Sequence, residues 1–315
     1  MNYLSHKLNE YGWFALKVSA LIAAVVIVVL KWRATTSEVI QMSLNVFTLE
    51  ALPWGLLIVI LASFNWILII IQWQYSTKDL APLNFVAAAK QCFIAFNWAF
   101  ITPSRIGEYG AKAAFYPSEQ RPQIIALQAC IHGTQLIATI IFGGVGVLIN
   151  SAVFPGVNLD ITPWSIGLCA AGFMSLFFLF LWVKQKQHLQ VLFLKSLRAL
   201  PRRKVAHIMG LSLLRYIIFS FMFLMIFRFL GAEISLLMGL STIACIYLFQ
   251  AIIPVFSMFD VVIRGSIALV LFTPYGLDSV LILSAIFLQW TLSALWPLAL
   301  GSIWQMTTLN KRTWA

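Results

Sequence analysis

The sequence predicts an all-α, polytopic membrane protein: a bundle of transmembrane helices with little soluble structure. The first observation is composition, since 61% of the 315 residues are hydrophobic and only 10% are charged, whereas soluble globular proteins carry about 25% charged residues. The second is a series of long apolar runs that approach or exceed the ~20 residues a helix needs to cross a bilayer. The third is a pair of proline-bounded, charged segments, which predict two short re-entrant or broken helices beside the full spans.

About eight full spans are expected, because eight apolar runs are each long enough for a transmembrane helix. In chain order they occupy 13–31, 52–74, 84–102, 123–150, 162–183, 205–230, 233–255 and 278–306. The first run has lysine or arginine on both flanks and no small-residue cleavage site after it, so we expect a retained helix and no cleaved signal peptide. Residues 34–50 are expected to form an interfacial helix or loop.

Two segments, 103–117 and 254–274, interrupt the apolar pattern. Each begins and ends with proline and contains glycine and charged residues. The first is too short to cross a hydrocarbon core ~30 Å thick as one helix. We therefore predict half-helices or hairpins, whose irregular backbone must be buried in protein or face water.

The surroundings of these segments suggest an internal repeat. The order apolar helix, proline, acid-x-x-x-base, proline, apolar helix occurs twice. The first copy contains Glu108 and Lys112, and the second contains Asp260 and Arg264. The preceding helices also resemble each other, as CFIAFNWAFITP and CIYLFQAIIP. The common order, more than any single match, predicts a repeat.

Basic residues determine the predicted topology. Seven lie in the stretch 184–204 with no acid among them, and such an excess is typical of cytoplasmic loops. If the two proline-bounded segments cross or re-enter, both termini are cytoplasmic as well. The two copies then have opposite orientations, as in transporters with inverted repeats. We predict one transmembrane domain over 1–315, with repeat halves at 52–150 and 205–307.

Charged residues within the membrane segments are the candidate functional residues, because each costs ~2.5–3.5 kcal/mol on insertion scales. The candidates are Arg105, Glu108, Lys112, Arg215, Asp260 and Arg264. Residues four apart share one helix face, so Glu108 can pair with Lys112. The same spacing lets Asp260 pair with Arg264. Such pairs leave a hydrated, dipolar spot in which an arginine could bind phosphate through its two-pronged donor group. Arg215 needs a partner on another helix.

No catalytic, metal or cofactor site is predicted, and we do not expect an enzyme. The four histidines lack any zinc-binding spacing, and GxSxG, Walker and CxxC motifs are absent from the sequence. His132, deep in an apolar run, is expected to be a packed, hydrogen-bonding residue. The polar residues expected to bridge helices are Asn65, Asn97, Gln135, Gln250 and Gln289. The formal net charge of +11 reflects topology, and nucleic acid is not an expected partner.

One stretch resembles a known family. The sequence TPSRIGEYGAKAAFY, followed by the helix IIALQACIHGTQLIATIIFGGVGVLI, is similar to the flippase-like transmembrane region of lysylphosphatidylglycerol synthases, which also occurs in a stand-alone form. That family has a Pro-x-x-x-Gly-Glu motif, which corresponds here to Pro103, Gly107 and Glu108. The resemblance extends over roughly residues 10–307, although its specific part is short.

The second motif of that family, Pro…Gly-Val-Arg-Glu, is altered in this chain. The corresponding residues begin at Pro254 and end in Val262-Ile263-Arg264-Gly265. The arginine is kept, but glycine replaces the usual glutamate. Asp260, one turn earlier, is the candidate substitute for that acid.

The resemblance implies a translocator of lipid headgroups that is not driven by ATP, in a bacterial cytoplasmic membrane. Its expected partners are anionic or polyprenyl-phosphate lipids. Arg105, Arg215 and Arg264 would contact the phosphate-bearing headgroup. Glu108 and Asp260 would hold those arginines or contact a cationic part of the substrate. The synthases add a soluble aminoacyl-transfer domain, and because this chain ends at Ala315 we expect no such activity.

Three alternatives remain open. The charged segments could be interfacial loops whose long side chains extend to water. The protein could be an intramembrane enzyme that acts on a polyprenyl-phosphate or glycolipid, with Glu108 or Asp260 as general base. It could also be an accessory subunit of a separate lipid-modifying enzyme. A homodimer is a further partnership that the sequence leaves open.

Overall fold

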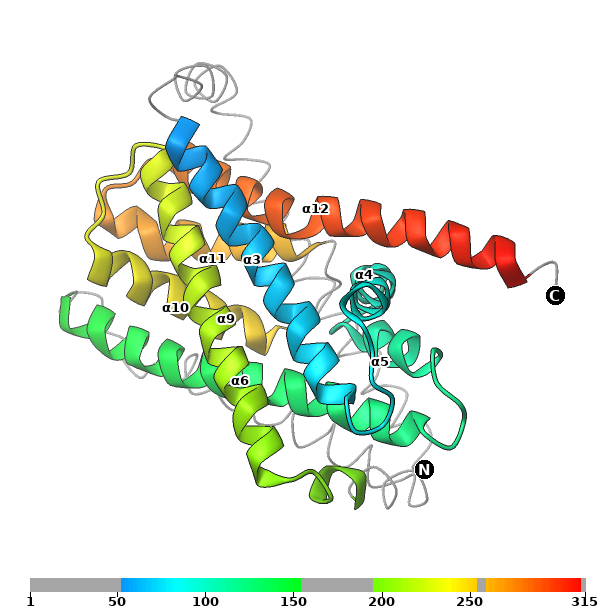
Figure 1. Ribbon diagram of the computed structural model, residues 1–315. Helices are drawn as coiled ribbons and strands as arrows, with labels where there is room; N and C mark the ends of the chain where they lie inside the picture. Colours follow the sequence, from blue (N-terminus) through cyan, green and yellow to red (C-terminus); the bar gives the residue numbers. More distant parts are fainter. Residues whose placement is uncertain (1–51, 154–194, 254–258, 313–315) are drawn as a thin grey trace, which may run out of the picture.

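The computed structural model describes residues 52–153, 195–253 and 259–312, which contain helices and no strand (Figure 1). The four long helices are α3 (Leu52–Thr77), α6 (Arg121–Val153), α9 (Arg202–Phe229) and α12 (Ser279–Arg312). The shorter elements are α4 (Phe85–Ile101), α5 (Ile106–Ala113), α10 (Leu236–Ile252), α11 (Asp260–Phe272) and the 3-10 turn η3 (Thr273–Tyr275).

The four long helices are apolar enough to cross a membrane, which fits a membrane protein. Helices α4 and α10 are also apolar but have only 17 residues each, about 25 Å at 1.5 Å per residue. The expectation of about eight full spans is therefore not supported. The predicted runs 13–31 and 162–183, and the segment 34–50, lie outside the described residues.

Local signals at both ends make α4 and α10 shorter than their apolar runs. The side chains of Asn84 and Ser235 cap the two helices by accepting a hydrogen bond from a backbone N–H three residues ahead. At the other ends, Thr102 and Ile253 have extended backbone. Each of these residues precedes a proline, and the residue before proline is disfavoured in the helical conformation.

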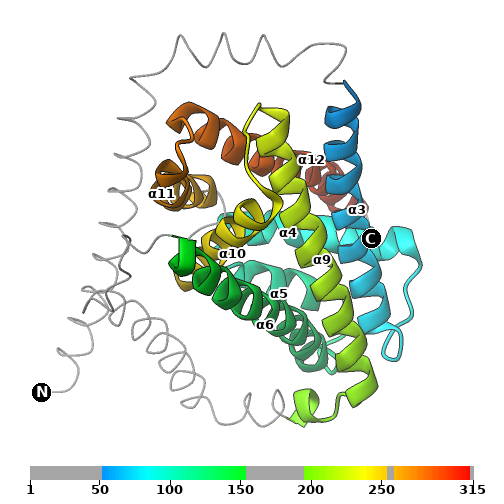
Figure 2. The same ribbon diagram turned by 90° about the vertical axis from the view of Figure 1, so that its left-hand side faces the viewer.

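The described helices form two halves, α3 to α6 and α9 to α12. Each half packs its second helix against the last helix of the other half. Helix α4 lies on α12, α10 lies on α6, and α3 lies along α9. Both views show α3 and α9 side by side in opposite directions, and α6 and α12 also run in opposite directions (Figures 1 and 2). The short helix α5 contacts α4 and α6, just as α11 contacts α10 and α12.

Glycines allow close approach where the two halves exchange helices. A Cβ on Gly301 of α12 would lie 2.4 Å from the carbonyl oxygen of Phe93 in α4. A Cβ on Gly143 of α6 would lie 3.1 Å from the carbonyl oxygen of Ala244 in α10. Both glycines stand 22 residues after the first residue of their helices, and both carbonyls stand 8 residues after the first residue of theirs. The two crossings are thus built at matching positions.

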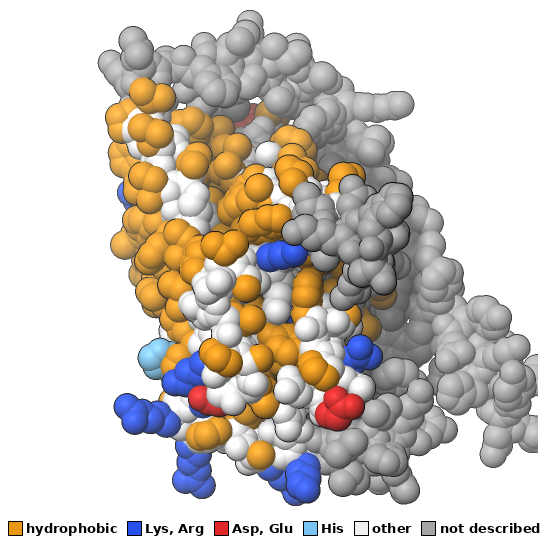
Figure 3. All heavy atoms as spheres, turned by 45° about the vertical axis from the view of Figure 1, so that its right-hand side comes forward, with side chains coloured by type: hydrophobic (Ala, Val, Ile, Leu, Met, Phe, Trp, Pro, Cys, Tyr) orange, Lys and Arg blue, Asp and Glu red, His pale blue; other side chains and the backbone are white. Residues whose placement is uncertain are grey.

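The surface divides into an apolar region and a basic end. Large apolar side chains point outward along the helices, for example Ile60 (62% exposed), Leu148 (70%) and Val270 (72%). Figure 3 shows hydrophobic side chains over much of the described face, with basic side chains gathered towards its lower end. At that end α3 finishes and α9 begins (Figure 1). Extended exposed apolar surface of this kind is typical of contact with a membrane or another protein.

Candidate functional site

The first candidate site begins where the chain breaks between α4 and α5. Ser104 and Arg105 both adopt left-handed backbone, with φ of 52° and 58°. The N–H of Gly107 then donates to Thr102 Oγ1 over 2.8 Å. A Cβ on Gly107 would lie 2.4 Å from the carbonyl oxygen of Trp98, so only glycine lets α5 approach the end of α4 this closely. This change of chain direction places the N-terminal end of α5 against α4 and α6.

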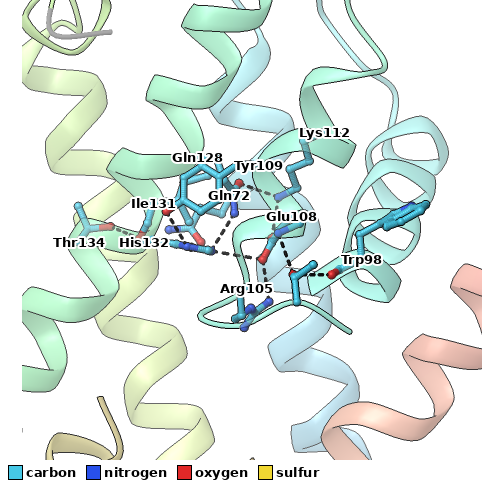
Figure 4. Close-up of polar contacts among 12 residues, drawn as sticks. Gln72, Trp98, Arg105, Glu108, Tyr109, Lys112, Gln128, Ile131, His132 and Thr134 are labelled. Carbon is cyan, nitrogen blue, oxygen red and sulfur yellow. Dashed lines mark hydrogen bonds and ion pairs between the residues drawn. The ribbon is translucent and has the colours of Figure 1, made fainter. Parts of the chain in front are cut away.

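Glu108 is the centre of this site (Figure 4). Its side chain is buried, and its carboxylate lies 2.9 Å from Arg105 Nη2 and 3.2 Å from Lys112 Nζ. His132 Nε2, on α6, lies 3.3 Å from the same carboxylate. The position in the first turn of α5 also favours a negative charge, because the helix dipole is positive there. We call Arg105, Glu108, Lys112 and His132 the Glu108 cluster.

Lys112 is unusual because its whole side chain is buried, at 2% exposure. Besides Glu108, its Nζ donates to Gln128 Oε1 of α6 over 2.8 Å. The same ammonium lies 4.1 Å from the centre of the Trp73 ring of α3, a distance at which a cation is attracted to the aromatic face. Lys112 therefore connects α5 to both α6 and α3.

Both ring nitrogens of His132 have polar neighbours. Gln128 Oε1 accepts from Lys112, so the Gln128 amide nitrogen is the atom that faces His132 Nε2, at 2.8 Å. The same Nε2 also lies 3.3 Å from the Glu108 carboxylate, so it faces both a donor and an acceptor. The other ring nitrogen, Nδ1, lies 3.0 Å from Tyr109 OH. His132 is thus the packed, hydrogen-bonding residue that the sequence predicts, and Glu108 is neutralised by Arg105 and Lys112.

Arg215 lies close by but has no acidic partner among the described residues. Its Nη1 donates to Gln72 Oε1 of α3 over 2.8 Å. Gln72 is 1% exposed and its amide nitrogen donates to Ser212 of α9, so it is fixed in position. The charge of Arg215 interacts electrostatically with those of Arg105 and Glu108. Arg215 thus adds a positive charge near the Glu108 cluster.

A second charged cluster is centred on Arg264 of α11, which is 7% exposed. Its Nη2 lies 2.6 Å from Asp260 Oδ2. Its Nε donates to Gln250 Oε1 of α10 over 3.1 Å, its Nη1 donates to Gln289 of α12, and Gln250 also donates to Asp260. The guanidinium carbon lies 5.8 Å from the centre of the Tyr247 ring. One acid balances one base in this cluster.

The structure therefore divides the six predicted site residues into two groups. Both ion pairs expected from the spacing of four are present, and Arg215 contacts a neutral glutamine. No ion pair or hydrogen bond between the two clusters is found within the described ranges. In the second motif, Pro254 lies outside the described residues. Gly265 brings no acid, and Asp260 supplies the carboxylate for Arg264.

Several residues of the site were not predicted from the sequence. Gln72, Gln128, Trp73 and Tyr109 all contact the candidate residues directly. The available signal was the presence of glutamine within long apolar helices, where an unpaired amide is costly. That signal identified Gln250 and Gln289 as bridging residues, a prediction that their contacts with Arg264 confirm.

Fold and site together fit a helical membrane protein that places charged groups between its helices. No protein-family model, curated protein or solved structure matches this chain. The resemblance to the flippase-like region of lysylphosphatidylglycerol synthases thus depends on the short motifs alone.

Proposed function

We propose that the protein moves a phosphate-bearing lipid, or its headgroup, between the leaflets of a membrane through the Glu108 cluster and Arg215. The observation that carries this proposal is an excess of positive charge around the buried carboxylate of Glu108. Arg105, Lys112 and Arg215 face one acid, Glu108, so two positive charges are not balanced by protein groups described here. Unbalanced charge in a bundle of apolar helices is costly, and an anionic ligand would reduce that cost.

The arginines offer free donors for such an anion. The Nε atoms of Arg105 and Arg215 are buried and have no hydrogen-bond partner within the described residues. A guanidinium binds phosphate best through two parallel N–H groups. Arg105 is also 43% exposed, so it can meet a ligand before the ligand reaches the buried part of the cluster.

The reciprocal packing supports the further proposal of inverted repeats. Exchange of α4 and α10 between the halves, with glycines at matching positions of α6 and α12, is what a two-fold relation between the halves produces. In transporters with such repeats, broken helices hold the substrate at the repeat interface. The short helices α5 and α11, which carry the two charge clusters, are the corresponding elements.

The proposal also assigns the protein to a bacterial cytoplasmic membrane, with both termini cytoplasmic. The family resemblance supports the membrane, and the basic end of the bundle supports the orientation, since cytoplasmic loops are enriched in lysine and arginine. An enzyme that uses Glu108 or Asp260 as general base is less well supported. Each carboxylate already contacts a basic side chain, which occupies oxygens that a base needs free.

The test is transbilayer movement of fluorescent phosphatidylglycerol in liposomes that contain the purified protein, read as loss of protection from a membrane-impermeant quencher. We expect the protein to accelerate movement. Loss of one charge-assisted contact costs about 1.5–3 kcal/mol, so Arg105→Gln and Arg215→Gln should each slow movement about tenfold or more. Arg198→Gln, which removes an exposed charge outside the cluster, should have no effect.

Two results would contradict the proposal: no acceleration by the wild-type protein, or equal rates for Arg105→Gln and Arg198→Gln. Lipid extracted after the assay and analysed by mass spectrometry separates transport from the enzyme alternative. Unchanged lipid is expected, and chemically altered lipid would favour an enzyme.

A further inference from the structure

A cavity of about 420 Å³ lies where α3 ends and α9 begins. Its lining includes Tyr75, Lys78, Asp79, Arg203, Lys204 and His207. These residues come from two segments that the sequence separates by more than a hundred positions, and the end of α3 and the start of α9 lie at the same end of the bundle (Figure 1). The cavity is therefore formed between two helix ends, and not within a single loop.

The cavity carries an excess of positive charge. Lys204 is 6% exposed and lies 2.9 Å from Asp79. The hydrogen bond from Lys204 lowers the pKa of the Asp79 carboxyl, so this acid is ionised and committed to Lys204 at neutral pH. Lys78 and Arg203 then face the cavity, and neither forms an ion pair with an acid among the described residues.

Aromatic contacts hold the wall of the cavity in place. The Tyr75 ring stacks on His207, with ring centres 4.2 Å apart. The ammonium of Lys78 lies 4.2 Å from the centre of the Tyr75 ring. An amphipathic tyrosine beside basic residues at the end of an apolar helix is typical of the level of the lipid headgroups.

An apolar hollow of about 460 Å³ continues from this cavity along α9. It shares Arg203 and His207 with the cavity, and then follows Gly210, Leu211 and Leu214. From residue 203 to residue 214 the helix rises roughly 16 Å. A Cβ on Gly210 would meet no atom within 4 Å, so the missing side chain leaves an open notch in the path. The hollow is long enough for a large part of an acyl chain.

We propose that the cavity and the hollow together bind one anionic phospholipid. Its phosphate lies between Lys78 and Arg203, and one acyl chain runs along α9 past Gly210. A headgroup site that continues directly into an apolar hollow matches an amphipathic ligand, whereas free phosphate would use only the cavity. This site is separate from the Glu108 cluster, so the proposal goes beyond lipid translocation and does not depend on it.

The experiment is native mass spectrometry of the delipidated protein in detergent, titrated with phosphatidylglycerol or with phosphatidylcholine of the same chains. Phosphatidylglycerol is expected to bind about tenfold tighter or more. Arg203→Gln should weaken phosphatidylglycerol binding about tenfold, as expected for loss of one charge-assisted contact. Arg202→Gln is the matched control, because this neighbour carries the same charge and lies outside both linings. It should bind like the wild type.

A second variant, Gly210→Leu, tests the acyl part without any change of charge. Leucine favours a helix over glycine, and a Cβ at this position meets no atom within 4 Å, so folding should be preserved. It should weaken binding of both lipids several-fold. Equal binding of the two lipids, or equal losses for Arg202→Gln and Arg203→Gln, would overturn the headgroup assignment. Wild-type binding by Gly210→Leu, with displacement of lipid by inorganic phosphate, would show that the site takes phosphate alone.

Discussion

Replacement of Glu108 by glutamine is expected to destabilise the folded protein by about 3–5 kcal/mol, as is typical when one partner of a buried ion pair is removed. Glutamine keeps the size of the side chain but loses the charge that balances Arg105 and Lys112. Lys112 is 2% exposed, so its ammonium cannot reach water without movement of α5. The measurement is the unfolding free energy of the purified protein in detergent micelles.

Two further variants show whether charge pairing causes this loss. Glu119→Gln removes the same charge from the exposed turn between α5 and α6 and should change stability little. The double variant Glu108→Gln with Lys112→Met should recover part of the loss, because the buried cation disappears together with its partner. If Glu108→Gln is as stable as Glu119→Gln, the buried cluster does not contribute to the fold as described.

Alanine at Gly301 is expected to destabilise the protein by about 1–3 kcal/mol, the usual cost of an extra methyl group in a tightly packed site. The added Cβ would lie 2.4 Å from the Phe93 carbonyl oxygen, and backbone cannot move aside as a side chain can. Gly146→Ala should have a similar effect at the other crossing, because its Cβ would lie 2.5 Å from the Ser241 carbonyl oxygen. Unfolding in detergent measures both losses.

The matched control is Gly144→Ala, two residues from Gly146 on the same helix. A Cβ at Gly144 meets nothing within 4 Å, and alanine favours the helix by up to about 1 kcal/mol over glycine. This variant should be as stable as the wild type or more stable. Equal losses for Gly144→Ala and Gly146→Ala would mean that the close crossing of α6 and α10 is not what makes glycine necessary.

The sequence predicted the helical class and the long helices because apolar length alone decides them. Among the described residues it predicted six full spans where four helices are long enough, since hydropathy does not register how Asn84 and Ser235 start a helix or how a following proline ends it. Reciprocal packing of the halves could not be predicted from hydropathy, because it depends on which helix faces meet. The glycines that permit the close crossings have no distinguishing pattern in the sequence.

The candidate site was predictable only in its local part. Pairing of Glu108 with Lys112 follows from a spacing of four on one helix, and the structure contains that pair. The contacts of Lys112 with Trp73 and Gln128 join three helices, and nothing in local spacing specifies them. Arg215 was expected to need a partner on another helix, and that partner is the neutral amide of Gln72.

The left-handed backbone at Ser104 and Arg105 means that the turn before α5 is conformationally strained. Residues other than glycine in this conformation cost of order 1–3 kcal/mol each and persist only when their surroundings hold them. The turn is held by the hydrogen bond from Gly107 N–H to Thr102 Oγ1 and by the ion pair of Arg105 with Glu108. An anion that draws the guanidinium away from Glu108 would thus remove one of the contacts that hold this conformation. Binding of an anion would then lower the stability of the turn.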